Sequence, residues 1–95
     1  MSYAIRLTPS ADRDTDELPT AALKAVAAKI EELAINPRPP GVKPLTEGKL
    51  KGSWRVHVGR DYCIGYDIDD KARVVEVWQI GNRRGFYERA KRRRR

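Results

Sequence analysis

The chain has one cysteine, one histidine and few aromatic side chains, which make up 7 % of its 95 residues. A single cysteine, Cys63, cannot form an internal disulfide, which argues against a disulfide-stabilised secreted domain. No apolar run approaches the roughly 20 residues that span a bilayer. The N-terminus lacks a basic start followed by an apolar block. We therefore expect a cytoplasmic protein with no membrane segment and no signal peptide.

The sequence also lacks the motifs of a metal or nucleotide site. It has no glycine-rich phosphate loop, no cysteine and histidine spacing for a metal, and no spacing that supports a Ser/His/Asp arrangement. We therefore expect no metal and no cofactor. With no partner cysteine, Cys63 is expected to be an inert small residue.

The length and composition predict one domain with one modest core, since 40 % of the residues are hydrophobic. We find no internal repeat and no linker that would divide the chain. We place the domain at residues 1–91 and a solvated basic tail at residues 92–95.

The positive charge is concentrated at the C-terminal end. Residues 71–95 carry 10 basic and 2 acidic side chains, net +8, whereas residues 1–36 carry 4 basic and 6 acidic ones, net −2. Such a basic segment attracts polyanions through phosphate contacts and counterion release. An acidic protein partner would use the same field, so charge alone leaves both classes of partner open.

Three short runs in the second half predict an antiparallel meander. The turns at 59–61 and 69–71 are too short to join neighbouring strands that run parallel. In the first run, Trp54, Val56 and Val58 face one way, and Arg55 and His57 face the other. The second run, 62–68, places its large apolar residues at even positions, and its tyrosines, like both tryptophans of the chain, are expected in the core.

The third run, 73–80, is apolar on both faces and is therefore expected inside the sheet. Its alternation predicts Val75 and Val77 on one face and Val74, Trp78 and Ile80 on the other.

The rest of the chain predicts helices around this meander, in the order β-α-α-β-β-β-α of a small α+β domain. A helix pair is expected to pack on one face of the sheet through the apolar stripe of the helix at 21–35. The residues of this stripe are Leu23, Val26, Ala27, Ile30, Leu33 and Ala34. The expected segments are a strand at 3–8, a helix capped by Ser10 and ending near Leu18, a helix at 21–35, an irregular surface loop at 38–53, and a short helix at 83–91.

Several phrases resemble the RelE/ParE superfamily of toxins from bacterial type II toxin–antitoxin systems. The end of the second helix, the entry to the meander, its middle strand and the Gly-x-Arg-Arg-x-x-Tyr ending carry the resemblance. These phrases are residues 35–41, 50–52 with 54–59, 61–66, and 80–87. The resemblance covers nearly the whole chain and implies the RelE-like fold.

The resemblance implies two different activities in two branches. RelE-like members are ribosome-dependent endoribonucleases that cut messenger RNA, and ParE-like members poison DNA gyrase without being nucleases. A third interpretation is a degenerate toxin that only binds its antitoxin. In every case the resemblance implies a cognate antitoxin, with a segment that folds on the toxin and covers or displaces the basic site. We predict the endoribonuclease, acting on mRNA on the ribosome through 2′-OH attack.

The catalytic residues that the resemblance implies are Arg55, His57, Arg83 and Tyr87. An imidazole suits proton transfer near neutral pH, and guanidinium groups stabilise charge on a phosphate in the transition state. Arg55 has an alternative interpretation as a cross-strand ion-pair partner of Asp67 or Glu76.

Cys63 departs from the family pattern, because many members have arginine at its position. One cation is therefore missing from this chain, or another residue such as Arg60 replaces it. The expected RNA-binding residues are Lys49, Lys51, Arg60 and Arg84.

Overall fold

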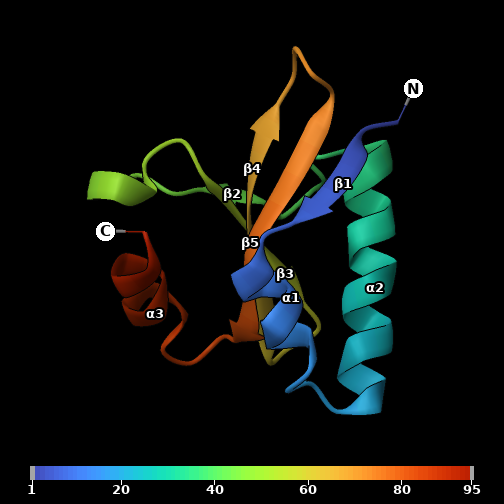
Figure 1. Ribbon diagram of the computed structural model, residues 1–95, viewed down its shortest axis with the longest axis vertical. Coiled ribbons are helices and arrows are strands. Elements are labelled where there is room, and N and C mark those ends of the chain that lie inside the picture. Colours follow the sequence, from blue (N-terminus) through green and yellow to red (C-terminus); the bar gives the residue numbers. More distant parts are fainter. Residues whose placement is uncertain (1, 95) are drawn as a thin grey trace.

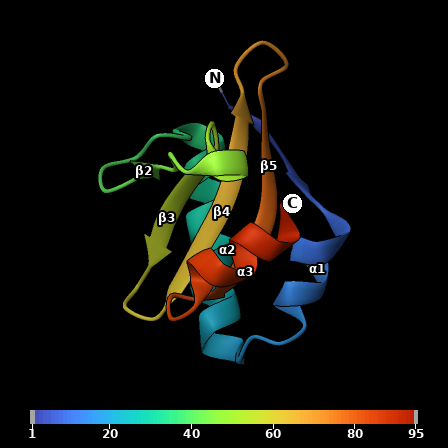
Figure 2. The same ribbon diagram turned by 90° about the vertical axis from the view of Figure 1, so that its left-hand side faces the viewer.

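The computed structural model describes residues 2–94, which form one sheet of five strands and three α-helices (Figure 1). The helices lie on both faces of the sheet (Figure 1). The strands lie in the order β1-β5-β4-β3-β2. Helices α1 and α2 cover one face of this sheet, and α3 crosses the other face (Figure 2). The predicted α+β fold is confirmed. No helix within residues 2–94 is long and apolar enough to cross a membrane.

The first strand, β1 (Ala4–Leu7), pairs in parallel with β5 (Val74–Asn82), with Ala4 opposite Val74. Parallel pairing is possible here because the helices and the other strands form a long crossover between them. The third predicted run thus has a neighbour on each side, β1 and β4, as its apolar faces indicated.

Helix α1 (Pro9–Thr15) begins one residue before the predicted cap. Thr8, not Ser10, is the N-cap: its hydroxyl accepts a hydrogen bond from the backbone N–H of Ala11 at 3.2 Å. Pro9 occupies the first helical position, where its missing N–H and fixed φ are favourable. The helix ends three residues before Leu18, and only turns follow it.

Helix α2 (Thr20–Ile35) matches the predicted helix within one residue. Val26 and Leu33 from its predicted stripe are buried in the core, and Ile30 packs against that core. Leu23, predicted on the same stripe, is 41 % exposed. The helix therefore makes a narrower contact with the sheet than its sequence pattern suggested.

The meander consists of β3 (Trp54–Val58), β4 (Tyr62–Asp69) and β5, paired antiparallel as predicted. The predicted alternation along β5 is wrong at one point. An irregularity places Gly65 opposite Gln79 but Tyr66 opposite Val77, so Trp78 is an extra residue on β5. Such a bulge shifts the alternation by one, as two residues then oppose one. Ile80 therefore joins Val77 in the core under α1 and α2, and Trp78 lies in the cluster under α3.

The segment at 38–53 is more ordered than the predicted irregular loop. A two-residue strand, β2 (Lys43–Pro44), pairs with β3, and a 3₁₀ turn, η1 (Gly48–Leu50), follows it. Leu45 and Leu50 are buried and form a small cluster with Trp78 and Ala90 of α3. These two leucines attach the loop to the α3 face of the sheet.

Helix α3 (Phe86–Arg93) follows Gly85, whose φ of 75° is in the left-handed region that glycine adopts without strain. The predicted start at Arg83 and end at Lys91 are both wrong. Arg92 and Arg93 belong to the helix, and Arg93 and Arg94 form ion pairs with Asp14 and Asp67. Those carboxylates explain why the expected solvated tail is docked up to Arg94. Arg95 lies outside the described residues.

Candidate functional site

The candidate site lies on the sheet face that α3 crosses, where β3 presents Arg55 and His57. Along β3, Trp54, Val56 and Val58 point toward α1 and α2 and are buried to differing degrees. Because side chains alternate along a strand, Arg55 and His57 point to the opposite face. Arg55 is only 8 % exposed, and His57 is partly exposed. The sequence prediction that these two side chains share a face is confirmed.

Arg55 and His57 are joined by a direct hydrogen bond. The guanidinium Nη1 of Arg55 donates to His57 Nε2 at 3.1 Å. Because a guanidinium has only donors, this bond requires an unprotonated Nε2. The proton of the neutral ring is then on Nδ1, which lies 3.5 Å from the sulfur of Cys63. The two neighbours together hold His57 in one tautomer.

The surroundings favour the neutral form of His57. Burial desolvates the ring and lowers its pKa below the ordinary value, and the charges of Arg55, Arg83 and Lys43 lower the pKa further. A neutral imidazole can accept a proton, so the environment suits a general base better than a general acid.

Cys63 lies opposite His57 on the neighbouring strand β4 and is fully buried. Burial raises the pKa of its thiol, although the charges of Arg55, Arg83 and Arg89 act in the opposite direction. The residue is therefore a neutral sulfur that supports the histidine ring. Within residues 2–94, no hydrogen bond or ion pair brings Arg60 to this position in its place.

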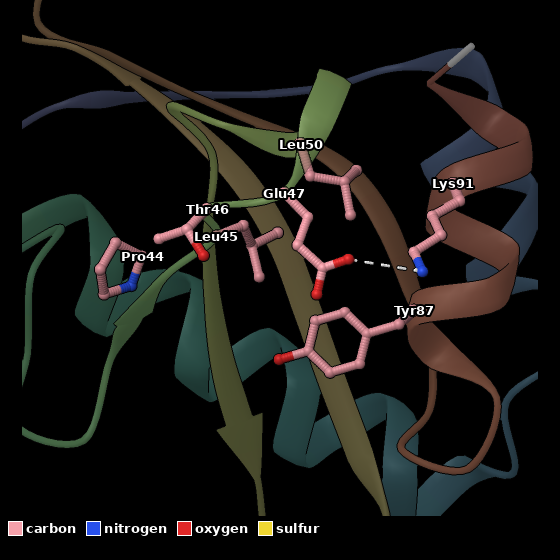
Figure 3. Close-up of a pocket in the computed structure, with 7 residues that line it drawn as sticks. All are labelled: Pro44, Leu45, Thr46, Glu47, Leu50, Tyr87 and Lys91. Carbon is pink, nitrogen blue, oxygen red and sulfur yellow. Dashed lines mark ion pairs between the residues drawn. The ribbon is translucent and has the colours of Figure 1, made fainter.

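Tyr87 reaches the site from the first turn of α3. The guanidinium carbon of Arg55 lies 5.2 Å from the centre of the Tyr87 ring, a cation–π contact. Tyr87 is 42 % exposed as a residue and also lines a pocket beside the site (Figure 3). The structure thus brings together three of the four predicted catalytic side chains, Arg55, His57 and Tyr87, by direct contacts.

Arg83 and Lys43 add further positive charge near His57. Arg83 follows β5, and its backbone N–H donates to the carbonyl of Asp61 at 2.6 Å, which fixes the chain beside the turn between β3 and β4. Lys43 lies opposite Arg55 in the β2–β3 pairing. Sequence reasoning placed Lys43 only on a loop, because a strand of two residues has no alternation to detect. The charges of both residues lower the pKa of His57.

The four predicted RNA-binding residues lie on the surface of the protein. All are exposed, and none contacts Arg55 or His57 through a hydrogen bond or ion pair within residues 2–94. Lys49 borders a shallow depression with Lys91 instead. The other three are Lys51, Arg60 and Arg84.

The alternative interpretation of Arg55 as a cross-strand ion-pair partner is wrong. Asp67 pairs with Arg94, and Glu76 pairs with Arg6. Among the described residues Arg55 has no carboxylate partner, and its Nε is buried without any hydrogen-bond partner. A nearly buried guanidinium without a counter-ion is expensive to maintain unless an anion binds there.

The fold of the chain matches the folds of solved toxins from toxin–antitoxin systems. The chain belongs to the family described as the ParE toxin of type II toxin-antitoxin system, parDE, whose sequence model matches residues 5–87. It is therefore a toxin of the RelE/ParE superfamily, and the predicted resemblance is confirmed.

Solved structures of such toxins are similar over most of the chain. The RelBE2 toxin–antitoxin complex from Mycobacterium tuberculosis matches with 31 % identity and a TM-score of 0.77, over 87 % of this chain and 100 % of that chain. The archaeal RelE–RelB complex from Pyrococcus horikoshii OT3 matches with 24 % identity and a TM-score of 0.74, over 87 % of this chain and 97 % of the other.

YafQ from E. coli strain BL21(DE3) matches with 18 % identity and a TM-score of 0.73, over 90 % of this chain and 98 % of the other. Below 25 % identity, the likeness shows the fold alone. The comparison with curated proteins gave no match.

Proposed function

We propose that this toxin is a metal-free endoribonuclease that cuts mRNA on the ribosome and is neutralised by a cognate antitoxin. The observation that carries the proposal is a histidine kept neutral within hydrogen-bond reach of a counter-ion-free arginine. Cleavage by the ribose 2′-OH needs a base for the hydroxyl proton and cations for the charge on the reacting phosphate. His57, Arg55 and Arg83 supply these groups.

The proposed reaction begins when the RNA phosphate draws the Arg55 guanidinium away from His57 Nε2. The freed Nε2 takes the proton of the 2′-hydroxyl, and the 2′-oxygen forms a bond to phosphorus. The bond from phosphorus to the 5′-oxygen breaks, and that oxygen takes up a proton from water. Arg55 and Arg83 stabilise the charge on the phosphate oxygens, and Tyr87 positions the nucleotide.

Primer extension on mRNA from a reconstituted translation reaction tests this proposal. The purified protein should produce cuts that need ribosomes, and these cuts should fall by at least about a hundredfold in His57→Ala, the range expected for loss of a general base. Arg83→Ala should weaken cleavage similarly. Lys24→Ala, which removes an exposed cation from α2 on the opposite face, is the control. Unchanged cleavage by His57→Ala would show that the assignment of the base is wrong.

Gyrase inhibition is the second candidate function, because the matching family model is that of the ParE toxin and the ParE-like branch poisons gyrase. In that case the face with Arg55 and His57 is a protein-binding surface and performs no chemistry. A supercoiling assay separates the two functions. Inhibition of purified gyrase, with no ribosome-dependent cuts from the same folded preparation, would favour the binder.

The proposed antitoxin partner is supported by the similar RelBE2 structure, which is a toxin–antitoxin complex. The basic face around α3 suits an acidic segment that is disordered alone and folds on the toxin. Co-expression with the antitoxin should restore growth, and the two chains should elute together in size-exclusion chromatography. Separate elution would contradict the proposal.

A further inference from the structure

A pocket of about 280 Å³ lies beside the catalytic cluster, between the β2–η1 loop and α3 (Figure 3). We propose that this pocket binds a guanine base of the RNA and so sets the sequence preference of cleavage. The proposal rests on the proposed nuclease function. The pocket is lined by Pro44, Leu45, Thr46, Glu47, Leu50, Tyr87 and Lys91.

Tyr87 links the pocket to the chemistry. Its ring lines the pocket, and the guanidinium of Arg55 lies over the same ring. With Arg55 on one face and 42 % of the residue exposed, the ring offers its other face as a stacking platform. A base stacked there would belong to a nucleotide whose phosphate is within reach of Arg55. Aromatic stacking holds unpaired bases in most single-strand RNA sites.

The walls of the pocket suit a flat, largely apolar ring. Leu45 and Leu50, which are buried in the cluster beneath α3, line the pocket together with Pro44. This surface is anchored, because both leucines pack against Trp78. The base would enter a cavity that already exists, with little rearrangement of the backbone.

The rim of the pocket carries one carboxylate and one ammonium group. Glu47 and Lys91 approach to 3.5 Å, and their side chains are 76 % and 50 % exposed (Figure 3). An ion pair this exposed contributes little, so the two groups can turn to a ligand at small cost. A surface that bound only phosphates would gain nothing from a carboxylate. The position of Glu47 therefore points to recognition of N–H groups on a base.

Guanine matches this pair better than the other bases. Its Watson–Crick edge presents two adjacent N–H donors, which a carboxylate accepts in bidentate fashion, next to a carbonyl oxygen that an ammonium group contacts. Uracil has one N–H between two carbonyls, and adenine and cytosine have no ring N–H on that edge. The geometry therefore predicts G over A, C and U at the nucleotide held by Tyr87.

Nucleotide titrations followed by amide NMR test the site without relying on cleavage. GMP should shift the backbone amides of Leu45, Thr46, Glu47 and Lys91, and AMP, CMP and UMP should do so about tenfold more weakly. The four nucleotides share the same phosphate and sugar, so the difference reports the base. Glu47→Gln should remove most of the preference for GMP. The control, Glu31→Gln, makes the same change on the exposed side of α2 and should preserve the preference.

Equal shifts by all four nucleotides, or no shifts in the pocket, would overturn the guanine site. The same NMR spectra report whether each variant is folded. If Glu47→Gln unfolds the protein, Lys91→Gln provides the second test and should also reduce the preference for GMP.

Sequencing of the 5′ ends of cleaved mRNA then separates this inference from the proposed function. The wild-type toxin should cut with a G enriched at one position near the cut, and Glu47→Gln should reduce that enrichment about tenfold. Cuts whose sequence preference is the same in the wild type and in Glu47→Gln would overturn the pocket and leave the nuclease proposal intact. Selective GMP binding with no cuts at all would support the pocket and refute the nuclease.

Discussion

His57 is held from two sides, by the Arg55 guanidinium at Nε2 and by the Cys63 sulfur at Nδ1. Both contacts act on the neutral ring, and the nearby cations oppose protonation. Cys63 thus has a role of its own in the site. It orients the imidazole without adding a charge.

The first prediction concerns the pH dependence of folding. The folded pKa of His57 lies below the unfolded value of about 6.5, so the folded state binds fewer protons between these two values. The contribution of His57 to stability is therefore fully present above about pH 6.5 and is lost as the pH falls through the lowered pKa. Chemical denaturation should show that His57→Gln loses less stability than the wild type between about pH 7.5 and pH 5. Equal losses would contradict the lowered pKa.

The second prediction concerns Cys63. The thiolate is the reactive form of cysteine, and this thiol is both fully buried and raised in pKa by that burial. A disulfide reagent should therefore react with the folded protein more than about tenfold slower than with the protein in guanidinium chloride. The denatured sample is the control for reagent quality. Equal rates would show that the site opens readily.

For single residues, the sequence predicted the positions that strand alternation determines. It missed the contacts that depend on how separate elements pack together. Alternation alone placed Arg55 and His57 on the polar face of β3. The contact between Tyr87 and Arg55 depends on where α3 crosses the sheet, which no local pattern encodes. Lys43 was missed as a site residue because its position follows from the pairing of β2 with β3.

Helix α3 is attached to the sheet by two carboxylates that come from other elements. Arg93 donates two hydrogen bonds to Asp14 of α1, at 2.7 and 3.2 Å. Arg94 donates to Asp67 of β4 at 2.8 Å and lies 4.6 Å from the Trp78 ring centre. These contacts lie at the opposite end of α3 from Tyr87. They fix the angle at which the helix presents that ring to the site.

The third prediction tests this attachment. Asp14→Asn replaces a partly buried ion pair by a neutral contact and should lower the free energy of unfolding by about 1–2 kcal/mol. Relative to the wild type, hydrogen exchange in this variant should accelerate more at the amides of α3 than at those of β4, because α3 loses its ion pair. Asp67→Asn should act in the same way. Glu31→Gln is the control, and α3 amides that exchange at the wild-type rate would contradict the role of the carboxylates.

The sequence predicted the elements better than their ends. The strong periodicity of α2 and the meander was sufficient, because burial on one face dictates it. The basic run after Lys91 looked solvated, since its partners Asp14 and Asp67 are far away in the sequence. The bulge at Trp78 was missed because apolar residues lie on both faces of β5, so their alternation does not mark the change of phase.

The charge of the basic C-terminal segment overstates what the folded molecule offers to a polyanion. Residues 71–95 carry a net charge of +8, but Lys91, Arg93 and Arg94 of this segment are paired with Glu47, Asp14 and Asp67 from other parts of the chain. Arg89 donates to the backbone carbonyls of Arg84 and Asn82. Arg92 has no carboxylate partner within residues 2–94 and is exposed on α3.

The fourth prediction follows from this division, and rests on RNA as the ligand. Each phosphate contact on a single strand adds about 0.7 to the slope of log affinity against log salt. Arg92→Gln should therefore reduce that slope by about 0.7 for a short single-stranded RNA. Arg94→Gln removes the same charge from a paired position and should change stability more than the slope. Fluorescence anisotropy over a salt series measures the slope, and equal reductions in both variants would contradict the division.

The pairing of β1 with β5 affects when the site can form during synthesis of the chain. Ala4 lies opposite Val74, so the first strand has no partner in the sheet until residues some 70 positions later have been made. Contacts so distant in sequence form slowly, and a chain grows from its N-terminus. Tyr87 and the arginines that attach α3 come later still. Synthesis of the chain must therefore be almost complete before the site can form. This order delays the activity of the toxin until the ribosome that makes it has nearly finished.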